Sequence, residues 1–141
     1  MTATDFIDTS VLVAAIVADE DCHEECDRLL DAGPLGILTH GLVETFSTLT
    51  GGRRAFRMSA DAAVTVMEED YLPSLEAVSL TPSETLRAMR ECQPRGVRGG
   101  AIFDYLHLVA ARKAKAKRLY TLNLSHFRAF QRPGDPEVLH P

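Results

Sequence analysis

Short apolar segments of strand length alternate with segments of helical pattern along the whole chain. The predicted strands are residues 6–7, 35–39, 75–80 and 118–122. The predicted helices are residues 11–17, 22–31, 42–49, 59–71, 82–90, 101–115 and 125–130. Strands joined through helices pair in parallel, because each helical crossover returns the chain to the same end of the sheet. The sequence therefore predicts an α/β fold of three layers, α/β/α, with a central, mostly parallel sheet.

Two of the predicted helices carry signals at their first residues. Ser10 precedes an apolar run, and a serine in this place is typical of an N-cap. Thr81, Pro82 and Glu84 combine an N-cap, a proline at the first helical position and a glutamate that completes a capping box. The segment 93–100, which contains one proline and three glycines, is predicted to be a loop before the next helix.

The composition is that of an ordinary globular domain. The chain has 141 residues, of which 45% are hydrophobic and 25% charged, so we expect a single domain over residues 1–141. The net charge of −5 argues against a protein that coats nucleic acid by bulk electrostatics, although it allows local contacts. No basic signal segment or membrane-length apolar run is present, so we expect a cytoplasmic protein with no membrane partner.

Three acidic residues have apolar neighbours. Asp8 follows the first predicted strand, at the end where α/β sheets bind ligands; a helix-capping role is the alternative. Asp104 lies in a helical segment that is apolar on nearly every face, so its carboxylate needs a basic partner or a bound cation. Glu44 lies among apolar residues of its predicted helix, and taken alone it would be a surface residue.

Four segments, in order and spacing, resemble the PIN domain, and within that family they are most similar to the VapC-type toxins of bacterial toxin–antitoxin pairs. These segments are Phe-Ile-Asp-Thr-Ser-Val-Leu at residues 6–12, the helix that begins shortly before Glu44, Ile-Phe-Asp-Tyr-Leu-His-Leu-Val-Ala-Ala at 102–111 and Tyr-Thr-Leu-Asn-Leu-Ser-His-Phe at 120–127. The resemblance spans residues 5–130. It implies a metal-dependent ribonuclease with a PIN-like fold.

The resemblance also implies roles for particular residues. Asp8, Glu44 and Asp104 would be the catalytic acids that hold Mg²⁺, for which Mn²⁺ could substitute. Asn123 stands where many family members have a fourth aspartate, so the number of bound ions, one or two, stays open. Ser10 and Thr121 adjoin the predicted pocket and would support the metal ligands through hydrogen bonds.

Several basic and sulfur-containing residues have two possible explanations. Arg95 and Arg98 could hold RNA phosphates beside the predicted pocket, or they could be solvated loop charges. The same alternatives apply to the cluster of Arg53, Arg54 and Arg57. His107 could assist proton transfer or serve the structure. Cys22, His23 and Cys26 look like half of a zinc site, but no second Cys/His pair completes it, so packing of reduced thiols is favoured.

Two functions follow from these observations. The first is a Mg²⁺-dependent endoribonuclease toxin that hydrolyses RNA phosphodiester bonds. The resemblance implies that it forms a homodimer and that a cognate VapB-type antitoxin neutralises it within a larger complex. The second is a catalytically weak or inactive interaction or RNA-binding protein on the same scaffold, which the asparagine at position 123 favours.

Overall fold

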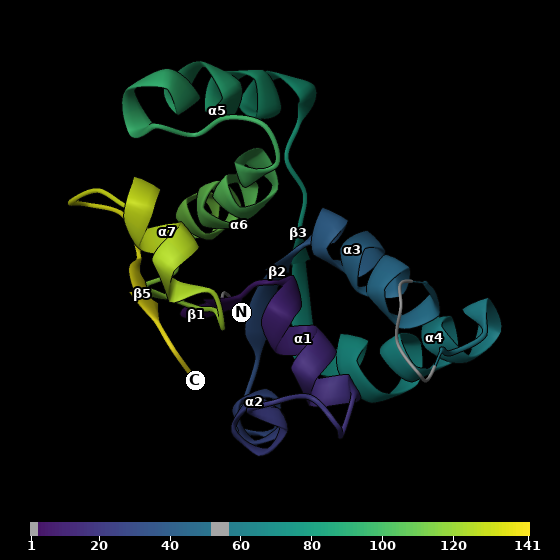
Figure 1. The fold of residues 1–141 in the computed structure, drawn as a ribbon. Coiled ribbons are helices and arrows are strands. Elements are labelled where there is room, and N and C mark those ends of the chain that lie inside the picture. The colour runs from purple at the N-terminus through teal and green to yellow at the C-terminus, as the bar shows by residue number, and fades with distance from the viewer. Residues whose placement is uncertain (1–2, 52–56) are drawn as a thin grey trace.

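A sheet of five parallel strands crosses the centre of the molecule (Figure 1). The computed structural model describes residues 3–51 and 57–141. The order of the strands in the sheet is β3-β2-β1-β4-β5. The strands are β1 (Asp5–Ile7), β2 (Leu35–Leu38), β3 (Leu75–Val78), β4 (Arg118–Tyr120) and β5 (Glu137–Leu139). The predicted parallel sheet is confirmed.

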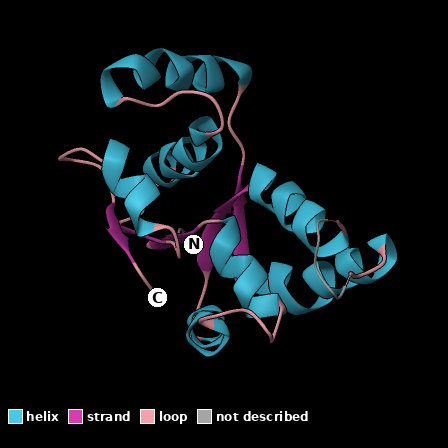
Figure 2. Cartoon of the chain, viewed as in Figure 1, coloured by secondary structure: helices cyan, strands magenta, loops and turns pink. Residues whose placement is uncertain are grey.

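Helices lie on both sides of this sheet (Figure 2). They are α1 (Thr9–Ile16), α2 (His23–Asp31), α3 (Thr39–Thr50), α4 (Ala60–Val66), α5 (Pro82–Arg95), α6 (Ala101–Lys113) and α7 (Leu124–Phe130). A π-helical turn (Met67–Tyr71) and a 3-10 turn (Leu72–Ser74) join α4 to β3. In the described part of the chain, no helix has both the length and the apolar character needed to cross a membrane.

Successive residues of β1 enter two different hydrophobic cores. Phe6 belongs to the core that contains Leu108 of α6 and Phe127 of α7. Ile7 belongs to the core that contains Leu12 of α1. Neighbouring residues of a strand face opposite sides of the sheet. Because Phe6 and Ile7 are both fully buried, both faces of the sheet are covered at β1. The two cores separate three layers, which confirms the predicted α/β/α architecture.

Gly36 of β2 allows the side chain of Phe6 to lie flat against the neighbouring strand. A Cβ atom at residue 36 would lie 2.3 Å from Cε1 of Phe6, far inside van der Waals contact. The pairing of β1 with β2 places Gly36 directly opposite Phe6. The close packing of this strand pair therefore requires a glycine.

The order of the strands puts a topological switch point beside β1. The chain moves outward from β1 through β2 to β3, and it then returns to β4 on the other side of β1. Open α/β sheets bind ligands outside the carboxyl ends of the strands at such a switch point. The residues that follow β1 and β4 at this point include Asp8 and Thr121.

The first helix begins earlier than predicted. Asp8, rather than Ser10, is the N-cap of α1, because its carboxylate accepts a hydrogen bond from the backbone N–H of Val11. The predicted capping role of Ser10 is wrong. Its hydroxyl donates to Asp8 instead, at 2.5 Å.

Helix α5 confirms the predicted capping box and corrects the predicted loop. The hydroxyl of Thr81 accepts from the backbone of Glu84, and the Glu84 carboxylate accepts from the backbone of Thr81. The helix continues to Arg95, with Pro94 in its last turn, although a loop was expected from residue 93. Gly96 ends it in the left-handed region, at a φ of 71°.

The fifth strand was not predicted from the sequence. β5 contains three residues and pairs with β4, where Val138 lies opposite Leu119. This strand follows Pro136 and a turn at Gly134, which has a φ of 93°. Its pairing depends on a strand distant in sequence, so no local pattern indicates it.

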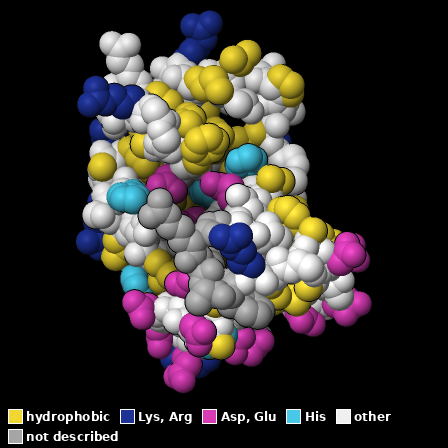
Figure 3. Space-filling view, turned by 45° about the vertical axis from the view of Figure 1, so that its right-hand side comes forward, with side chains coloured by type: hydrophobic (Ala, Val, Ile, Leu, Met, Phe, Trp, Pro, Cys, Tyr) yellow, Lys and Arg dark blue, Asp and Glu magenta, His cyan; other side chains and the backbone are white. Residues whose placement is uncertain are grey.

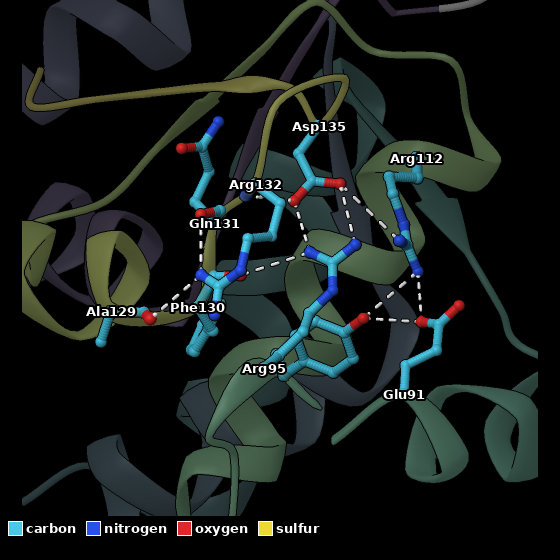
Figure 4. Close-up of polar contacts among 9 residues, drawn as sticks. Glu91, Arg95, Arg112, Ala129, Phe130, Gln131, Arg132 and Asp135 are labelled. Atoms are coloured by element: carbon cyan, nitrogen blue, oxygen red, sulfur yellow. Dashed lines mark hydrogen bonds and ion pairs between the residues drawn. The ribbon is translucent and has the colours of Figure 1, made fainter. Parts of the chain in front are cut away.

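A network of buried charges fastens α5 to the segment before β5 (Figure 4). Nη1 of Arg95 donates to Oδ2 of Asp135 at 2.5 Å and to the carbonyl of Phe130 at 3.3 Å. The side chains of Arg95 and Asp135 are only 17% and 4% exposed. The guanidinium of Arg95 is therefore engaged within the protein, and its predicted contact with RNA phosphates stays a prediction.

The same network continues into α6 through Tyr105. The guanidinium groups of Arg95 and Arg112 lie 5.4 and 5.8 Å from the centroid of its ring. Its hydroxyl donates to Glu91 at 2.6 Å, and Arg112 donates to the same carboxylate at 2.7 Å. Burial and the Glu91 contact raise the pKa of Tyr105 to about 12. These contacts join α5, α6 and the approach to β5.

Loss of the Asp135 charge should destabilise the fold. We expect Asp135→Asn to lower the free energy of unfolding by about 3 kcal/mol, because the nearly buried Arg95 loses its anionic partner. Urea denaturation measures this change. The control is Asp19→Asn, which removes an exposed aspartate and should have little effect. Equal stability of the two variants would contradict the structural role of the network.

Candidate functional site

Asp8 links the carboxyl ends of β1 and β4. Its carboxylate is buried, with 2% of the residue exposed. Oδ1 accepts from the hydroxyl of Ser10 at 2.5 Å and from the backbone of Val11 at 3.3 Å. Oδ2 accepts from the hydroxyl of Thr121, beyond β4, at 2.6 Å. The backbone N–H of Asp8 also donates to the carbonyl of Tyr120. The sequence-predicted residues Asp8, Ser10 and Thr121 thus meet at the switch point.

Burial raises the pKa of Asp8 above its ordinary value of 3.8. A positive charge on His107 and the hydrogen bonds from Ser10, Thr121 and Val11 act in the opposite direction but do not outweigh burial. Hydroxyl and amide groups are the hydrogen-bond donors to this carboxylate among the described residues, and none of them is a cation. A positive charge close to Asp8 would therefore offset the cost of burying its carboxylate.

Glu44 of α3 lies against a buried histidine of α6. Its Oε1 accepts from Nε2 of His107 at 2.8 Å and from the hydroxyl of Thr9 at 2.9 Å. Burial on its own would raise the pKa of Glu44, but the contacts with His107, Thr9 and the charge of His40 prevail and lower it. Glu44 is therefore ionised more readily than an ordinary glutamate.

Asp104 lies in the first turn of α6 with 30% of its side chain exposed. Its Oδ2 lies 3.3 Å from Nδ1 of His126 in α7. A pocket of about 400 Å³ opens beside this pair; its lining includes Gly100, Ala101, Ser125 and Ala129. Asp104 thus faces α7, whereas Glu44 faces α1 and the middle of α6.

The surface has a hollow at this place. In Figure 3, acidic side chains lie on two sides of a hollow near the middle of the face, and histidine side chains lie beside them. A Lys or Arg side chain also lies just below the hollow in this view. The acidic side chains at the hollow offer negative charge to a cation or to a basic peptide.

Asn123 is tied to the same threonine as Asp8. Its backbone N–H donates to the hydroxyl of Thr121 at 2.9 Å. The residue is exposed and precedes α7, and its side chain does not cap that helix. The structure brings Asn123 next to the Asp8 network through its backbone.

The predicted arginines differ in their surroundings. Arg98 is exposed in the turn between α5 and α6, near the start of the helix that carries Asp104. Arg57 is exposed as well. Arg53 and Arg54 lie outside the described residues. The predicted contact between Arg98 and an RNA phosphate is therefore compatible with the exposed position of this side chain on the α5–α6 turn.

Two histidines at this site were not assigned to it from the sequence. His126 is exposed, and its Nδ1 contacts Asp104. His40, in the first turn of α3, stacks on Phe103 of α6 with ring centroids 5.9 Å apart. His40 precedes Glu44 by one helical turn, and Phe103 precedes Asp104 by one residue. The short sequence distances from His40 to Glu44 and from Phe103 to Asp104 were the signal that could have placed His40 at the site.

The cysteines do not form a zinc site. Cys26 is buried in the core, and Nδ1 of His23 lies 2.7 Å from the carbonyl of Ala14. Cys22, Cys26 and Cys92 are free thiols. Burial raises the pKa of Cys26 to about 12, so this thiol stays protonated. The favoured packing role agrees with these contacts.

The PIN domain model matches residues 6–132 of the chain. This range contains β2 to β4, all of β1 except Asp5, and Asp8, Glu44 and Asp104. The chain belongs to the PIN domain family. PIN domains form a nuclease family, whose members generally use divalent metal ions. Among curated proteins, no relative matches the sequence of this PIN domain.

Solved structures share the fold of this PIN domain at low sequence identity. VapC20 of Mycobacterium tuberculosis, described as a toxin that cleaves the sarcin–ricin loop, has a TM-score of 0.70 and 22% identity, covering 94% of this chain and 99% of its own. VapBC2 of Rickettsia felis, bound to a promoter DNA fragment, has a TM-score of 0.64 and 16% identity, covering 96% and 97%. FitAB, bound to the IR36 DNA fragment, has a TM-score of 0.62 and 15% identity, covering 97% and 94%.

The acidic residues of this PIN domain fit a hydrated divalent ion. Over residues 3–51 and 57–141, no three or more Asp, Glu, His or Cys side chains form a ready-made metal cage. Asp8, Glu44 and Asp104 supply carboxylate oxygens, the donors that Mg²⁺ prefers, and Mg²⁺ commonly keeps several waters and uses one or two carboxylates. A closed site of the structural zinc type does not fit.

The burial of Asp8 predicts that its charge weakens the metal-free PIN domain. Because the folded state raises the pKa of Asp8, the native protein holds this proton more tightly than the unfolded chain does. Stability is therefore lost as the pH rises from 3.8 through the folded-state pKa. We expect Asp8→Asn, which removes the charge, to be more stable than the wild type at pH 7 in EDTA.

Urea denaturation at several pH values measures this difference. The advantage of Asp8→Asn should shrink toward pH 3.8 and vanish below it, where the wild-type carboxyl becomes neutral in both states. Asp19→Asn serves as the exposed control. An advantage of Asp8→Asn that does not depend on pH would contradict the assignment of the penalty to the Asp8 charge.

Proposed function

We propose that this PIN domain is a VapC-type endoribonuclease toxin that hydrolyses RNA phosphodiester bonds with Mg²⁺, or with Mn²⁺ in its place. The observation that supports this most is the buried Asp8 carboxylate, which lies at the switch point of the sheet with neutral hydrogen-bond donors around it. Such a carboxylate is stabilised by a cation. The resemblance of four segments to VapC-type toxins gives the substrate class.

The proposed catalytic residues have complementary properties. A bound divalent ion would supply positive charge that stabilises the developing charge on the phosphate. Asp8, Glu44 and Asp104 would hold it, and Asn123 is a further oxygen donor in the same loop region. The lowered pKa of Glu44 keeps its carboxylate ionised, so that it would attract the ion and orient an attacking water through a hydrogen bond. Ser10 and Thr121 keep Asp8 in place.

Single-stranded RNA agrees with the surroundings of these acids. RNA-binding proteins stack unpaired bases on aromatic side chains and bind phosphates through arginine. Phe103 and His40 form an exposed stacked pair next to the proposed acids, and Arg98 is an exposed cation on the adjoining turn. We propose that the enzyme acts in the cytoplasm, where cellular RNA is accessible.

Removal of a catalytic acid should abolish most of the activity. We expect Asp8→Asn or Asp104→Asn to reduce RNA cleavage by at least about 100-fold, because each removes charge that stabilises the transition state. Cleavage of total RNA in Mg²⁺, compared with the Asp19→Asn control, measures this effect. Folded Asp8→Asn or Asp104→Asn protein with nearly wild-type cleavage would overturn the proposed site.

A binding protein without catalysis is the second candidate function. Asn123 supports it, because an uncharged side chain occupies the position of a fourth acid, and the described residues contain no ready-made metal cage. RNA cleavage titrated with Mg²⁺ or Mn²⁺ separates the two functions. Cleavage that requires the ion favours the enzyme, and binding of RNA without cleavage at any ion concentration favours the second candidate.

The proposed toxin would be controlled by a VapB-type antitoxin. VapBC2 and FitAB, which share the fold, are described as two-component assemblies bound to DNA. A basic segment of an antitoxin could pair with Asp8, Glu44 or Asp104, because charge-assisted hydrogen bonds to partly buried carboxylates are strong. We further propose that the toxin is a homodimer within a larger toxin–antitoxin complex.

Mg²⁺ should compete with the antitoxin if a basic side chain enters the acidic site. We expect the apparent Kd for the antitoxin encoded by the adjoining gene to rise as Mg²⁺ is added at constant ionic strength. Isothermal titration calorimetry with and without Mg²⁺ measures the change, and KCl at matched ionic strength is the control. An affinity that does not depend on Mg²⁺ would exclude direct occupation of the acids.

A further inference from the structure

His107 is a buried polar side chain in the middle of α6, with 1% of the residue exposed. Its Nε2 lies 2.8 Å from Oε1 of Glu44 and 3.3 Å from the hydroxyl of Thr9. The Thr9 hydroxyl uses its hydrogen on the same oxygen of Glu44. The contact between His107 and the carboxylate therefore requires the proton of the imidazole on Nε2.

The two oxygens of Glu44 are consequently unequal. Oε1 accepts hydrogen bonds from both Thr9 and His107. Both hydrogen bonds that residues 3–51 and 57–141 make to the Glu44 carboxylate end on Oε1. These residues therefore hold the carboxylate through one oxygen and leave Oε2 to a ligand, a water molecule or a cation.

The packing of α3 against α6 fixes the position of the imidazole. A Cβ atom at Gly41 would lie 3.0 Å from Cε1 of His107 and 3.2 Å from Cγ1 of Ile37, so a side chain at residue 41 would require these neighbours to shift by a few tenths of an ångström. The other ring nitrogen, Nδ1, is buried and has no hydrogen-bond partner among the described residues. A buried polar atom without a partner disfavours the folded state, so packing alone does not explain a histidine here.

We propose that His107 is a positioning residue for Glu44: it holds Oε1 through Nε2–H and thereby presents Oε2 alone to the site. Glu44 then acts through a single oxygen, as a monodentate ligand or as the acceptor for a water proton, rather than as a bidentate ligand. Gly41 supports this arrangement because it leaves room for the ring. The catalytic consequence of this arrangement rests on the proposed function, whereas the contact between His107 and Glu44 does not depend on it.

Three variants separate this role from simple core packing. His107→Leu removes the donor, His107→Gln can retain an amide donor, and Gly41→Ala displaces the ring without changing any polar group. The matched control is Thr45→Val, which removes a buried hydroxyl of α3 that donates to the Gly41 carbonyl and does not touch the Glu44 carboxylate. Thermal unfolding of all four variants shows which of them are folded.

Kinetics and metal binding give the decisive readouts. We expect His107→Leu to lower kcat for RNA cleavage and the affinity for Mn²⁺ by about 10- to 100-fold, the range typical of residues that orient a metal ligand, with KM for RNA nearly unchanged. Gly41→Ala should change both quantities in the same direction, and His107→Gln should recover part of the loss. Thr45→Val should retain wild-type kcat and Mn²⁺ affinity.

Two results would overturn the proposal. One is a folded His107→Leu protein with wild-type kcat and Mn²⁺ affinity, and the other is a loss in Thr45→Val as large as that in His107→Leu. NMR of the metal-free protein keeps the test independent of the proposed function. If the wild type cleaves no RNA, the proposed function fails; a Glu44 carboxyl signal that shifts in His107→Leu but not in Thr45→Val still supports the contact, and an unshifted signal overturns it.

Discussion

The burial of one carboxylate, that of Asp8, constrains the centre of this PIN domain. Its two oxygens take hydrogen bonds from Ser10, from the backbone of Val11 and from Thr121. These donors belong to the start of α1 and to the segment after β4, which are more than 100 residues apart in sequence. Because a buried carboxylate without donors is strongly unfavourable, these hydrogen bonds link the ends of β1 and β4 to the start of α1.

Most of the fold could be predicted from the sequence, because its signals are local. The Thr81–Glu84 capping box and the apolar strands each depend on neighbouring residues, and the structure has them where expected. The parts that were not predicted depend on distant partners. Strand β5 needs β4 as its neighbour, and Arg95 in the last turn of α5 pairs with Asp135, 40 residues away.

The acids of the candidate site could be predicted from the sequence, but the residues that contact them could not. Position after a strand singled out Asp8, and an apolar helical environment singled out Asp104. Nothing in the sequence pairs Glu44 with His107, 63 residues away, or Asp104 with His126, because these contacts arise only when α3, α6 and α7 pack around the sheet. The ion pair of Arg95 could not be predicted for the same reason, because its partner Asp135 lies on another segment.

The two most enclosed acids of the site have opposite electrostatic settings. Burial raises the pKa of Asp8, whereas His107 and Thr9 outweigh burial at Glu44 and lower its pKa. Pairs of carboxyl groups whose surroundings move their pKa values apart commonly divide the roles in catalysis. In the proposed enzyme, Glu44 would be ionised before the ion binds, whereas the buried Asp8 would gain most from the arrival of a cation. Binding of a divalent ion would therefore be coupled to loss of the Asp8 proton, so ion affinity should rise with pH over the range in which this carboxyl titrates.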